Sequence, residues 1–172
     1  GGGLSSAVNS AANNLANSGT LPCGPGEFPI PGEPLSVNGE NVEGDPALKE
    51  AIAAQYRCDP EGVVLAAGTS GANFLACATL LEPGDETLIE LPTYEPLLAV
   101  ADYLGAAIRR FSRSHGNGYR IDPDEVRSLV TPRTKLIVLT SPHNPRGVVV
   151  DPETLRALAR LAEEAEAVLL VD

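Results

Sequence analysis

The chain has 172 residues, of which 43% are apolar and 20% are charged, and its formal net charge is −11. This is the composition of an ordinary globular protein that is long enough for one sizeable core. The acidic balance argues against nucleic acid or an anionic membrane as the main partner, because both bind clustered Lys and Arg.

The three cysteines and the ends of the chain add further expectations. The cysteines show no C-x-x-C spacing, so we expect neither a disulfide framework nor a metal site. Reduced cysteines favour a cytoplasmic protein. We see no apolar run long enough to span a membrane and no signal peptide. The chain contains no Met, which predicts a processed product or a fragment.

The first 45 residues differ in composition from the rest. They are rich in Gly, Pro, Asn and Ser, which favour turns and extended segments over packed helix. We predict that residues 1–45 form an extended arm or small-domain segment and that residues 46–172 form a larger domain. A helix begins at Pro46. A short β-like run at 63–66 precedes an Ala-rich helix that starts near Gly68.

From residue 83 onward, apolar β-like runs alternate with helical patterns. Strands are predicted at 87–91, 107–111, 135–140 and 167–171. One helix is predicted to open at 92–96 and to run to 103–104, a short helix to start at 122–125, and a third to span 152 to about 165. This alternation predicts an α/β fold with a mainly parallel sheet and right-handed crossovers. Strands such as 135–140 and 167–171 are almost continuously apolar, which suits a sheet covered on both faces, as in a three-layer α/β/α domain.

Small and hydroxyl-bearing residues occupy the start of the Ala-rich helix. Backbone N–H groups there can approach an anion, the helix N-terminus adds a partial positive charge, and the hydroxyls of Thr69 and Ser70 can donate. With Gly71 they form a candidate phosphate site. The segment matches neither the P-loop nor the dinucleotide motif. It stays open whether Thr69 and Ser70 only cap the helix.

Three further polar or aromatic residues follow predicted strands. Tyr94 can stack on a flat ring, and the amide of Asn144 can hydrogen-bond a ligand oxygen. Asp172 ends an apolar strand, where a carboxylate needs a partner such as a cationic ring nitrogen. Each also has a plain explanation: a half-buried Tyr, a turn Asn and an Asp that starts a loop. His143 has no visible carboxylate partner, so we interpret it as a turn residue.

The four features become informative together. An anion cradle, a ring stacker, an amide and a carboxylate follow, in chain order, four predicted strands of one sheet, the first of them the run at 63–66. Carboxyl ends of parallel strands meet at one edge of a sheet, where open α/β sheets bind ligands. The combination predicts a site for a flat, anionic, heteroaromatic cofactor.

At this point the chain resembles the N-terminal part of fold-type I pyridoxal-phosphate (PLP) enzymes of the class I/II aminotransferase family, from about Leu15 to Asp172. The most specific segment, 141–147, reads Ser-Pro-His-Asn-Pro-Arg-Gly and resembles the family's S-P-[NH]-N-P-[TS]-G. Three other segments also resemble family elements: 81–86 (L-x-P-G-D-E), 92–94 (P-x-Y) and 44–53 (G-x-P-x-L-[RK]-x-A-[IL]-A).

The resemblance implies PLP as cofactor, an amino acid and a 2-oxo acid as substrates, and a homodimer. It also implies a role for each matching residue. Thr69, Ser70 and Gly71 would hold the phosphate, Tyr94 would stack on the ring, Asn144 would bond the 3-oxygen, Asp172 would pair with the ring nitrogen, and Gly19 would lie near the substrate carboxylate.

The chain also departs from the family pattern. Arg146 stands where the family has Thr or Ser, and residues 39–43 lack a Tyr that many members carry. The family's Schiff-base lysine is expected beyond Asp172, since neither Lys49 nor Lys135 has the right context. We therefore expect no catalytic residue within this chain, which would be an incomplete fragment and inactive by itself.

Two other functions stay open at this stage. One is a PLP-dependent lyase or decarboxylase on the same scaffold. The other is a non-catalytic remnant or interaction module that has lost PLP.

Overall fold

The computed structural model describes residues 24–27 and 44–172. The chain divides into two units, Gly1–Val42 and Glu43–Asp172, and each is treated by itself. In the first unit the described residues form one 3-10 turn, η1 (Pro25–Glu27). The prediction of a separate arm over residues 1–45 stays a prediction.

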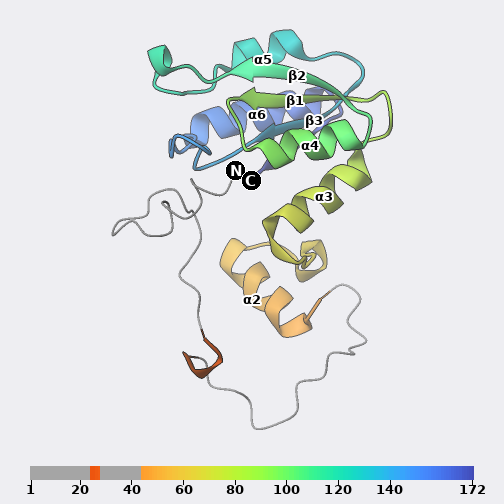
Figure 1. Ribbon diagram of the computed structural model, residues 1–172, viewed down its shortest axis with the longest axis vertical. Helices are drawn as coiled ribbons and strands as arrows, with labels where there is room; N and C mark the ends of the chain where they lie inside the picture. The colour runs from red at the N-terminus through yellow and green to blue at the C-terminus, as the bar shows by residue number, and fades with distance from the viewer. Residues whose placement is uncertain (1–23, 28–43) are drawn as a thin grey trace, which may run out of the picture. The chain divides into compact units, whose positions relative to one another are not determined.

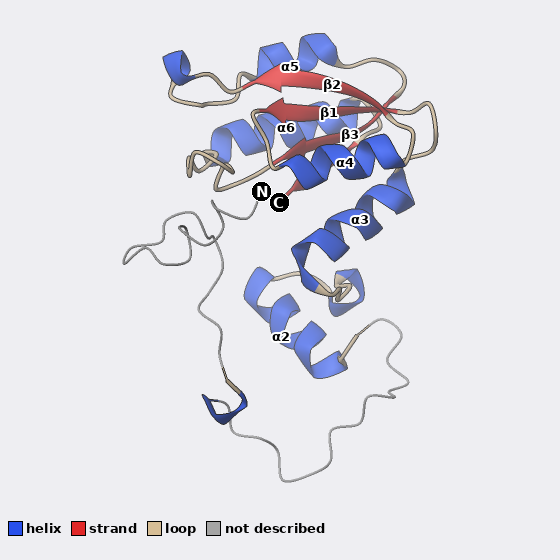
Figure 2. Ribbon diagram, viewed as in Figure 1, coloured by secondary structure: helices blue, strands red, loops and turns tan. Residues whose placement is uncertain are grey.

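The second unit is built on a sheet of four parallel strands (Figures 1 and 2). The strands are β1 (Glu86–Leu91), β2 (Ala107–Ser112), β3 (Thr134–Leu139) and β4 (Val168–Val171). Their order is β2-β1-β3-β4, and every neighbouring pair is parallel. The prediction of an α/β fold with a parallel sheet is therefore confirmed.

Two helices precede the first strand, and three alternate with the strands, near the predicted positions. They are α2 (Pro46–Tyr56), α3 (Gly68–Leu80), α4 (Glu95–Tyr103), α5 (Pro123–Leu129) and α6 (Pro152–Glu164), with short 3-10 turns η2 (Pro60–Gly62) and η3 (His115–Asn117). Within the described residues, every helix is too short or too polar to span a membrane.

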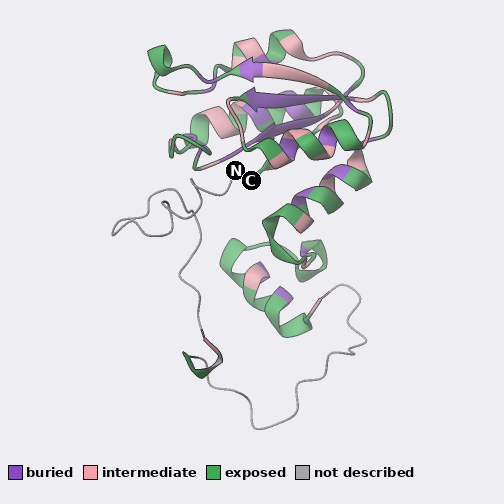
Figure 3. Ribbon diagram, in the orientation of Figure 1, coloured by how far each residue is buried: buried purple, intermediate pink, exposed green. Residues whose placement is uncertain are grey.

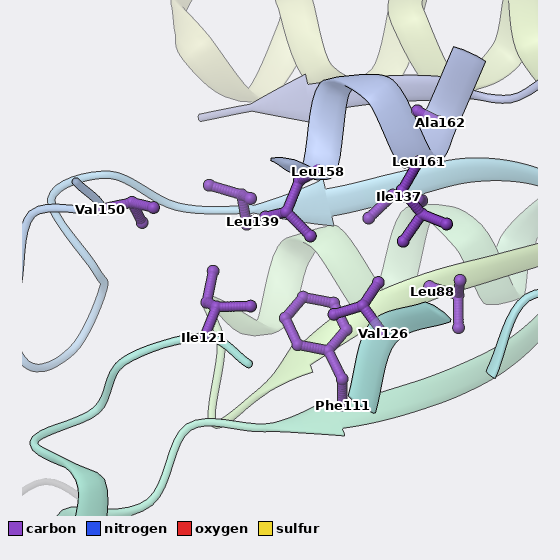
Figure 4. Close-up of a cluster of buried hydrophobic side chains, with 10 residues drawn as sticks. All are labelled: Leu88, Phe111, Ile121, Val126, Ile137, Leu139, Val150, Leu158, Leu161 and Ala162. Carbon is purple, nitrogen blue, oxygen red and sulfur yellow. The ribbon is translucent and has the colours of Figure 1, made fainter. Parts of the chain in front are cut away.

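Each face of the sheet has its own apolar core. On one face, Ile137 and Leu139 of β3 pack with Phe111 and with side chains of α5 and α6 (Figure 4). On the other face, Leu136 and Val138 pack with side chains of α3 and α4. Adjacent residues of a strand point to opposite faces, so an unbroken apolar strand serves both cores. The three-layer α/β/α prediction is confirmed.

Burial is greatest in the central strands β1 and β3, which Figure 3 shows largely in the colour of buried residues. The outer strands β2 and β4 are more exposed. The centre of the sheet therefore has little contact with water, and a polar side chain there needs a partner within the protein.

The predicted strand at 63–66 is wrong. These residues are not in a strand, and they pair with no other strand in the described part of the chain. Val63 is buried, but Val64 is 69% exposed. A β-like run becomes a strand only where a neighbour completes its hydrogen bonds. The candidate phosphate segment therefore follows an extended stretch instead of a strand.

The connections place a topological switch point at the carboxyl ends of β1 and β3. The helix that follows β1, α4, packs on one face of the sheet, whereas the helix that follows β3, α6, packs on the other. β1 and β3 are neighbours, so the chain leaves them in opposite directions. Such a switch point is where open α/β sheets bind ligands.

Candidate functional site

Three of the predicted site residues follow neighbouring strands at this edge of the sheet. Tyr94 follows β1, Asn144 follows β3 and Asp172 follows β4, and the sheet order places β3 between the other two. Backbone hydrogen bonds extend the β3–β4 pairing past the strand ends. Asp172 N donates to Leu139 O, and Ser141 N donates to Asp172 O, each over 2.9 Å.

Asp172 is also joined to α3. The side-chain amide of Asn73 donates to Asp172 Oδ1 over 2.9 Å, and Asn73 is 8% exposed. Asn73 lies one turn after Thr69 in the same helix. This bond therefore brings the first turns of α3 close to the carboxyl end of β4.

The start of α3 can receive an anion. Ala67, the residue before the helix, makes no side-chain capping hydrogen bond. Thr69 and Ser70 are exposed, and Gly71 is half-buried. The first N–H groups of a helix lack partners within it, and they carry its partial positive charge. The N-cap is thus Ala67 and not Thr69 or Ser70, and both hydroxyl-bearing residues are exposed.

Tyr94 and Asn144 both present side chains to solvent. Tyr94 is 37% exposed, and its carbonyl accepts the Leu97 N–H at the start of α4. Asn144 is exposed within a tight turn, in which Gly147 adopts a φ of 71°. The left-handed backbone of Gly147 suits a glycine and closes the turn.

The predicted substrate-binding residue, Gly19, lies outside the described residues. The other six are described. Hydrogen bonds link Asp172 to α3 and to the end of β3, whereas Tyr94 shares the same edge through the order of the strands. Sequence reasoning missed Asn73. The available signal was its position four residues before Cys77, which places this amide on the buried face of an apolar helix.

A buried polar cluster beneath this edge was also missed. Arg113 Nη1 donates to Glu90 Oε2 over 2.7 Å, and both side chains are 0% exposed. Glu90 Oε1 accepts from both the backbone N–H and the hydroxyl of Thr140, over 2.8 and 2.6 Å. A charged residue near the end of an apolar strand was the available signal.

His143 lies in the turn, as predicted, but the rest of its interpretation is wrong. Its side chain is buried, and Nε2 donates to Pro92 O over 2.9 Å. The same nitrogen lies 3.9 Å from Glu90 Oε1, so a carboxylate is close after all. Sequence reasoning overlooked this because the two residues come from different strand ends.

Three buried polar atoms have no hydrogen-bond partner among the described residues: Thr93 Oγ1, Arg113 Nη2 and His143 Nδ1. All three residues lie just beyond the carboxyl ends of β1, β2 and β3. Buried polar atoms normally have partners, so such atoms indicate places for water or a polar ligand.

Two further arginines, Arg110 and Arg146, make contacts near the residues of this edge. Arg110 donates to the backbone carbonyls of Ile89 and Glu90, over 3.1 and 2.6 Å. Burial lowers the pKa of the Arg110 guanidinium, and the charge of Glu90 opposes this shift. Arg146 is exposed, and its guanidinium lies 5.2 Å from the centre of the Tyr119 ring.

Within the described residues, no group of three or more His, Cys, Asp or Glu could hold a metal ion.

Comparison with known proteins identifies the family of this chain. Residues 38–172 match the family model for aminotransferase class I and II. A capreomycidine synthase of Streptomyces vinaceus is 40% identical over 130 residues, which are 75% of this chain and 33% of that protein. An aspartate/prephenate aminotransferase of Thermus thermophilus is 35% identical over 135 residues, covering 75% of this chain and 35% of that protein.

A solved structure agrees with these matches. The crystal structure of a PLP-dependent aminotransferase from Streptococcus suis is similar with a TM-score of 0.76 at 34% identity. The match covers 80% of this chain and 37% of that chain. The present chain thus spans about a third of the length of the relatives it matches.

Proposed function

Since the chain belongs to the aminotransferase class I and II family, we propose that its residues form the noncovalent part of a PLP site. The whole protein would transfer an amino group between an amino acid and a 2-oxo acid. The hydrogen bond from Asn73 to Asp172 carries the proposal, because it joins the candidate phosphate site to the candidate ring-nitrogen partner.

The side chains and backbone groups at this edge suit the parts of PLP. An uncapped helix N-terminus with two exposed hydroxyls suits a phosphate. A carboxylate suits a protonated ring nitrogen, and an exposed amide suits the 3-oxygen. The partly exposed ring of Tyr94 offers a face for stacking.

PLP, when bound, supplies a ring that withdraws electrons from a carbanion beside the substrate nitrogen. The part of Asp172 is electrostatic. A carboxylate next to the ring nitrogen raises the pKa of that nitrogen and keeps it protonated. Asn73 holds one carboxylate oxygen in place, which leaves the other oxygen for the ring. Thr69, Ser70 and Gly71 bind and orient the phosphate.

The remaining features of the proposal rest on the family and on the sequence. The amino-acid and 2-oxo-acid substrates follow from membership of the family. The homodimer and the cytoplasmic location are proposals from the resemblance and from cysteine usage.

PLP binding by the full chain tests the proposal. Titration with PLP, followed by absorbance and by the thermal midpoint, should show saturable binding. Asp172→Ala should weaken binding about 10- to 100-fold, as expected for a lost charged hydrogen bond. Asn144→Ala should also weaken it. Asp102→Ala, an exposed Asp of α4, is the matched control and should bind normally.

Circular dichroism of each variant checks that it is folded. A folded wild-type chain that does not bind PLP would contradict the proposal and favour a non-catalytic remnant.

A PLP-dependent lyase or decarboxylase is the second candidate. The observation in its favour is that a relative 40% identical over 130 residues is called a synthase, not an aminotransferase. Product analysis of the whole protein separates the two. A 2-oxo acid formed only with an accepting keto acid supports transfer, whereas ammonia or carbon dioxide supports the second candidate.

A further inference from the structure

Hydrogen bonds link Asn144 to the buried carboxylate of Glu90 through one hydroxyl. The backbone N–H of Asn144 donates to Thr140 Oγ1 over 2.8 Å, and Thr140 Oγ1 donates to Glu90 Oε1 over 2.6 Å. A hydroxyl has a single proton. Because the Thr140 hydroxyl uses this proton in its hydrogen bond to Glu90, the lone pairs of Thr140 Oγ1 are left to accept the Asn144 N–H.

Hydrogen bonds hold the Glu90 side chain in place on both of its carboxylate oxygens. Its other oxygen accepts from Arg113, which also donates to Tyr119 O over 2.7 Å and to Thr140 O over 3.2 Å. The side chains of Glu90 and Arg113 are fully buried, so water does not compete for these bonds. Hydrogen bonds in such surroundings are strong, and they reinforce one another.

The backbone of Asn144 is therefore fixed by a hydrogen bond, while the residue remains exposed to solvent. Thr140 fixes the backbone nitrogen of Asn144, and the following Pro145 restricts the Asn144 backbone from the other side. The side chain is exposed at the edge where the proposed function places the 3-oxygen of PLP. An amide on a fixed backbone does not have to be ordered when the ligand arrives.

We propose that Thr140 and Glu90 are positioning residues that preorganise Asn144 for the 3-oxygen of PLP. The inference rests on the proposed function. It requires that the Thr140 hydroxyl act on PLP through Asn144, and not through the general stability of the fold.

A double-mutant cycle on the full chain measures this dependence. Thr140→Val should weaken PLP binding about 3- to 10-fold, the factor for one hydrogen bond. In an Asn144→Ala background the same substitution should change the affinity less than about 2-fold, because the two residues act as one unit. Thr140→Ser keeps the hydroxyl and should bind as the wild type does. The absorption maximum of bound PLP should shift alike in Thr140→Val and Asn144→Ala.

The chain offers a matched control for each substitution. Thr87 has a fully buried hydroxyl that donates to Leu136 O over 3.2 Å, so Thr87→Val makes the same change away from the site. Glu86 is a buried carboxylate at the opposite end of β1, so Glu86→Gln is the control for Glu90→Gln. Both controls should lower the thermal midpoint and leave PLP affinity unchanged, whereas Glu90→Gln should weaken PLP binding.

The outcomes separate the inference from the proposed function. If wild type binds PLP but Thr140→Val weakens binding equally with and without Asn144, the inference is wrong and the proposed function stands. The same holds if Thr87→Val weakens binding as much as Thr140→Val does. If the folded wild type does not bind PLP, both are wrong. Should Glu90→Gln fail to fold, the Thr140 cycle alone decides.

Discussion

At the scale of single residues, the unusual feature is the fully buried ion pair between Glu90 and Arg113 beneath the carboxyl edge of the sheet. Both side chains are 0% exposed, with Nη1 and Oε2 2.7 Å apart. Removing two charges from water is unfavourable, and their attraction offsets this only where further hydrogen bonds complete the site. Thr140 provides such bonds to Glu90, and the Tyr119 carbonyl provides one to Arg113.

Breaking this pair from one side should be strongly destabilising. Arg113→Met leaves Glu90 buried without its cation, and we expect the free energy of unfolding to fall by about 3–5 kcal/mol. The double variant Glu90→Leu/Arg113→Met removes both charges and should recover most of that loss. Urea unfolding of the three proteins measures it. A loss below about 1 kcal/mol in the single variant would mean that the pair behaves like a surface ion pair.

At the scale of elements, an Asp-Pro dipeptide begins four helical segments. Asp45, Asp59, Asp122 and Asp151 precede α2, η2, α5 and α6, and each side chain accepts a backbone N–H in the first turn. The Asp satisfies a helix N–H that would otherwise lack a partner, and the Pro sets the first helical φ. This pattern is local, so the sequence alone predicts where α2, α5 and α6 begin.

Two carboxylates, Asp151 at the start of α6 and Glu86 at the start of β1, predict how stability depends on pH. The Thr154 backbone N–H, followed by its hydroxyl, lowers the pKa of Asp151. The Thr131 hydroxyl, with Arg133 and Arg109, lowers the pKa of Glu86. Both groups bind protons more weakly in the folded state, so the unfolded chain takes up protons first as the pH falls. Stability should therefore be lost below about pH 4, near the ordinary pKa values of Asp and Glu.

Thermal midpoints measured between about pH 6 and about pH 3 check this expectation. Asp151→Asn still caps α6 but does not titrate, and Glu86→Gln removes the other carboxylate. The midpoints of both variants should change less with pH than that of the wild type. Parallel curves for wild type and variants would contradict these assignments.

At the scale of the whole sheet, the two edges differ in character. The edge strand β2 carries Arg109 and Arg110, and charged side chains on an edge discourage pairing with other chains. The other edge, β4, presents Val168 and Val171, which are 43% and 47% exposed. Among the described strands β4 pairs with β3 alone. An apolar edge with unpaired backbone groups favours association.

We therefore expect the chain to associate as its concentration rises. Val171→Lys should shift the equilibrium toward the monomer, because a charge on the edge opposes strand addition. Val149→Lys is the control, since Val149 is 67% exposed but lies in a loop. Size-exclusion chromatography with light scattering reports the masses. A wild type that stays monomeric at high concentration, or equal effects of the two variants, would contradict this expectation.

The sequence by itself determined the local features of this protein. Periodicity predicted β1 to β4, Pro46 indicated the start of α2, and segment 141–147 indicated the family, because each signal lies within a few neighbouring residues. Six of the seven candidate site residues fall in the described part of the chain, and three of them follow strands at one edge of the sheet. Their roles toward PLP stay predictions.

Only the tertiary structure decided which distant residues meet. Asn73 and Asp172 are 99 residues apart in the chain, and Glu90 and Thr140 are 50 apart. No local pattern encodes such pairs, because they depend on the order β2-β1-β3-β4 and on the faces to which α3 and α4 pack. For the same reason the run at 63–66 did not become a strand: its residues suit a strand, but in the described fold no neighbouring strand pairs with them.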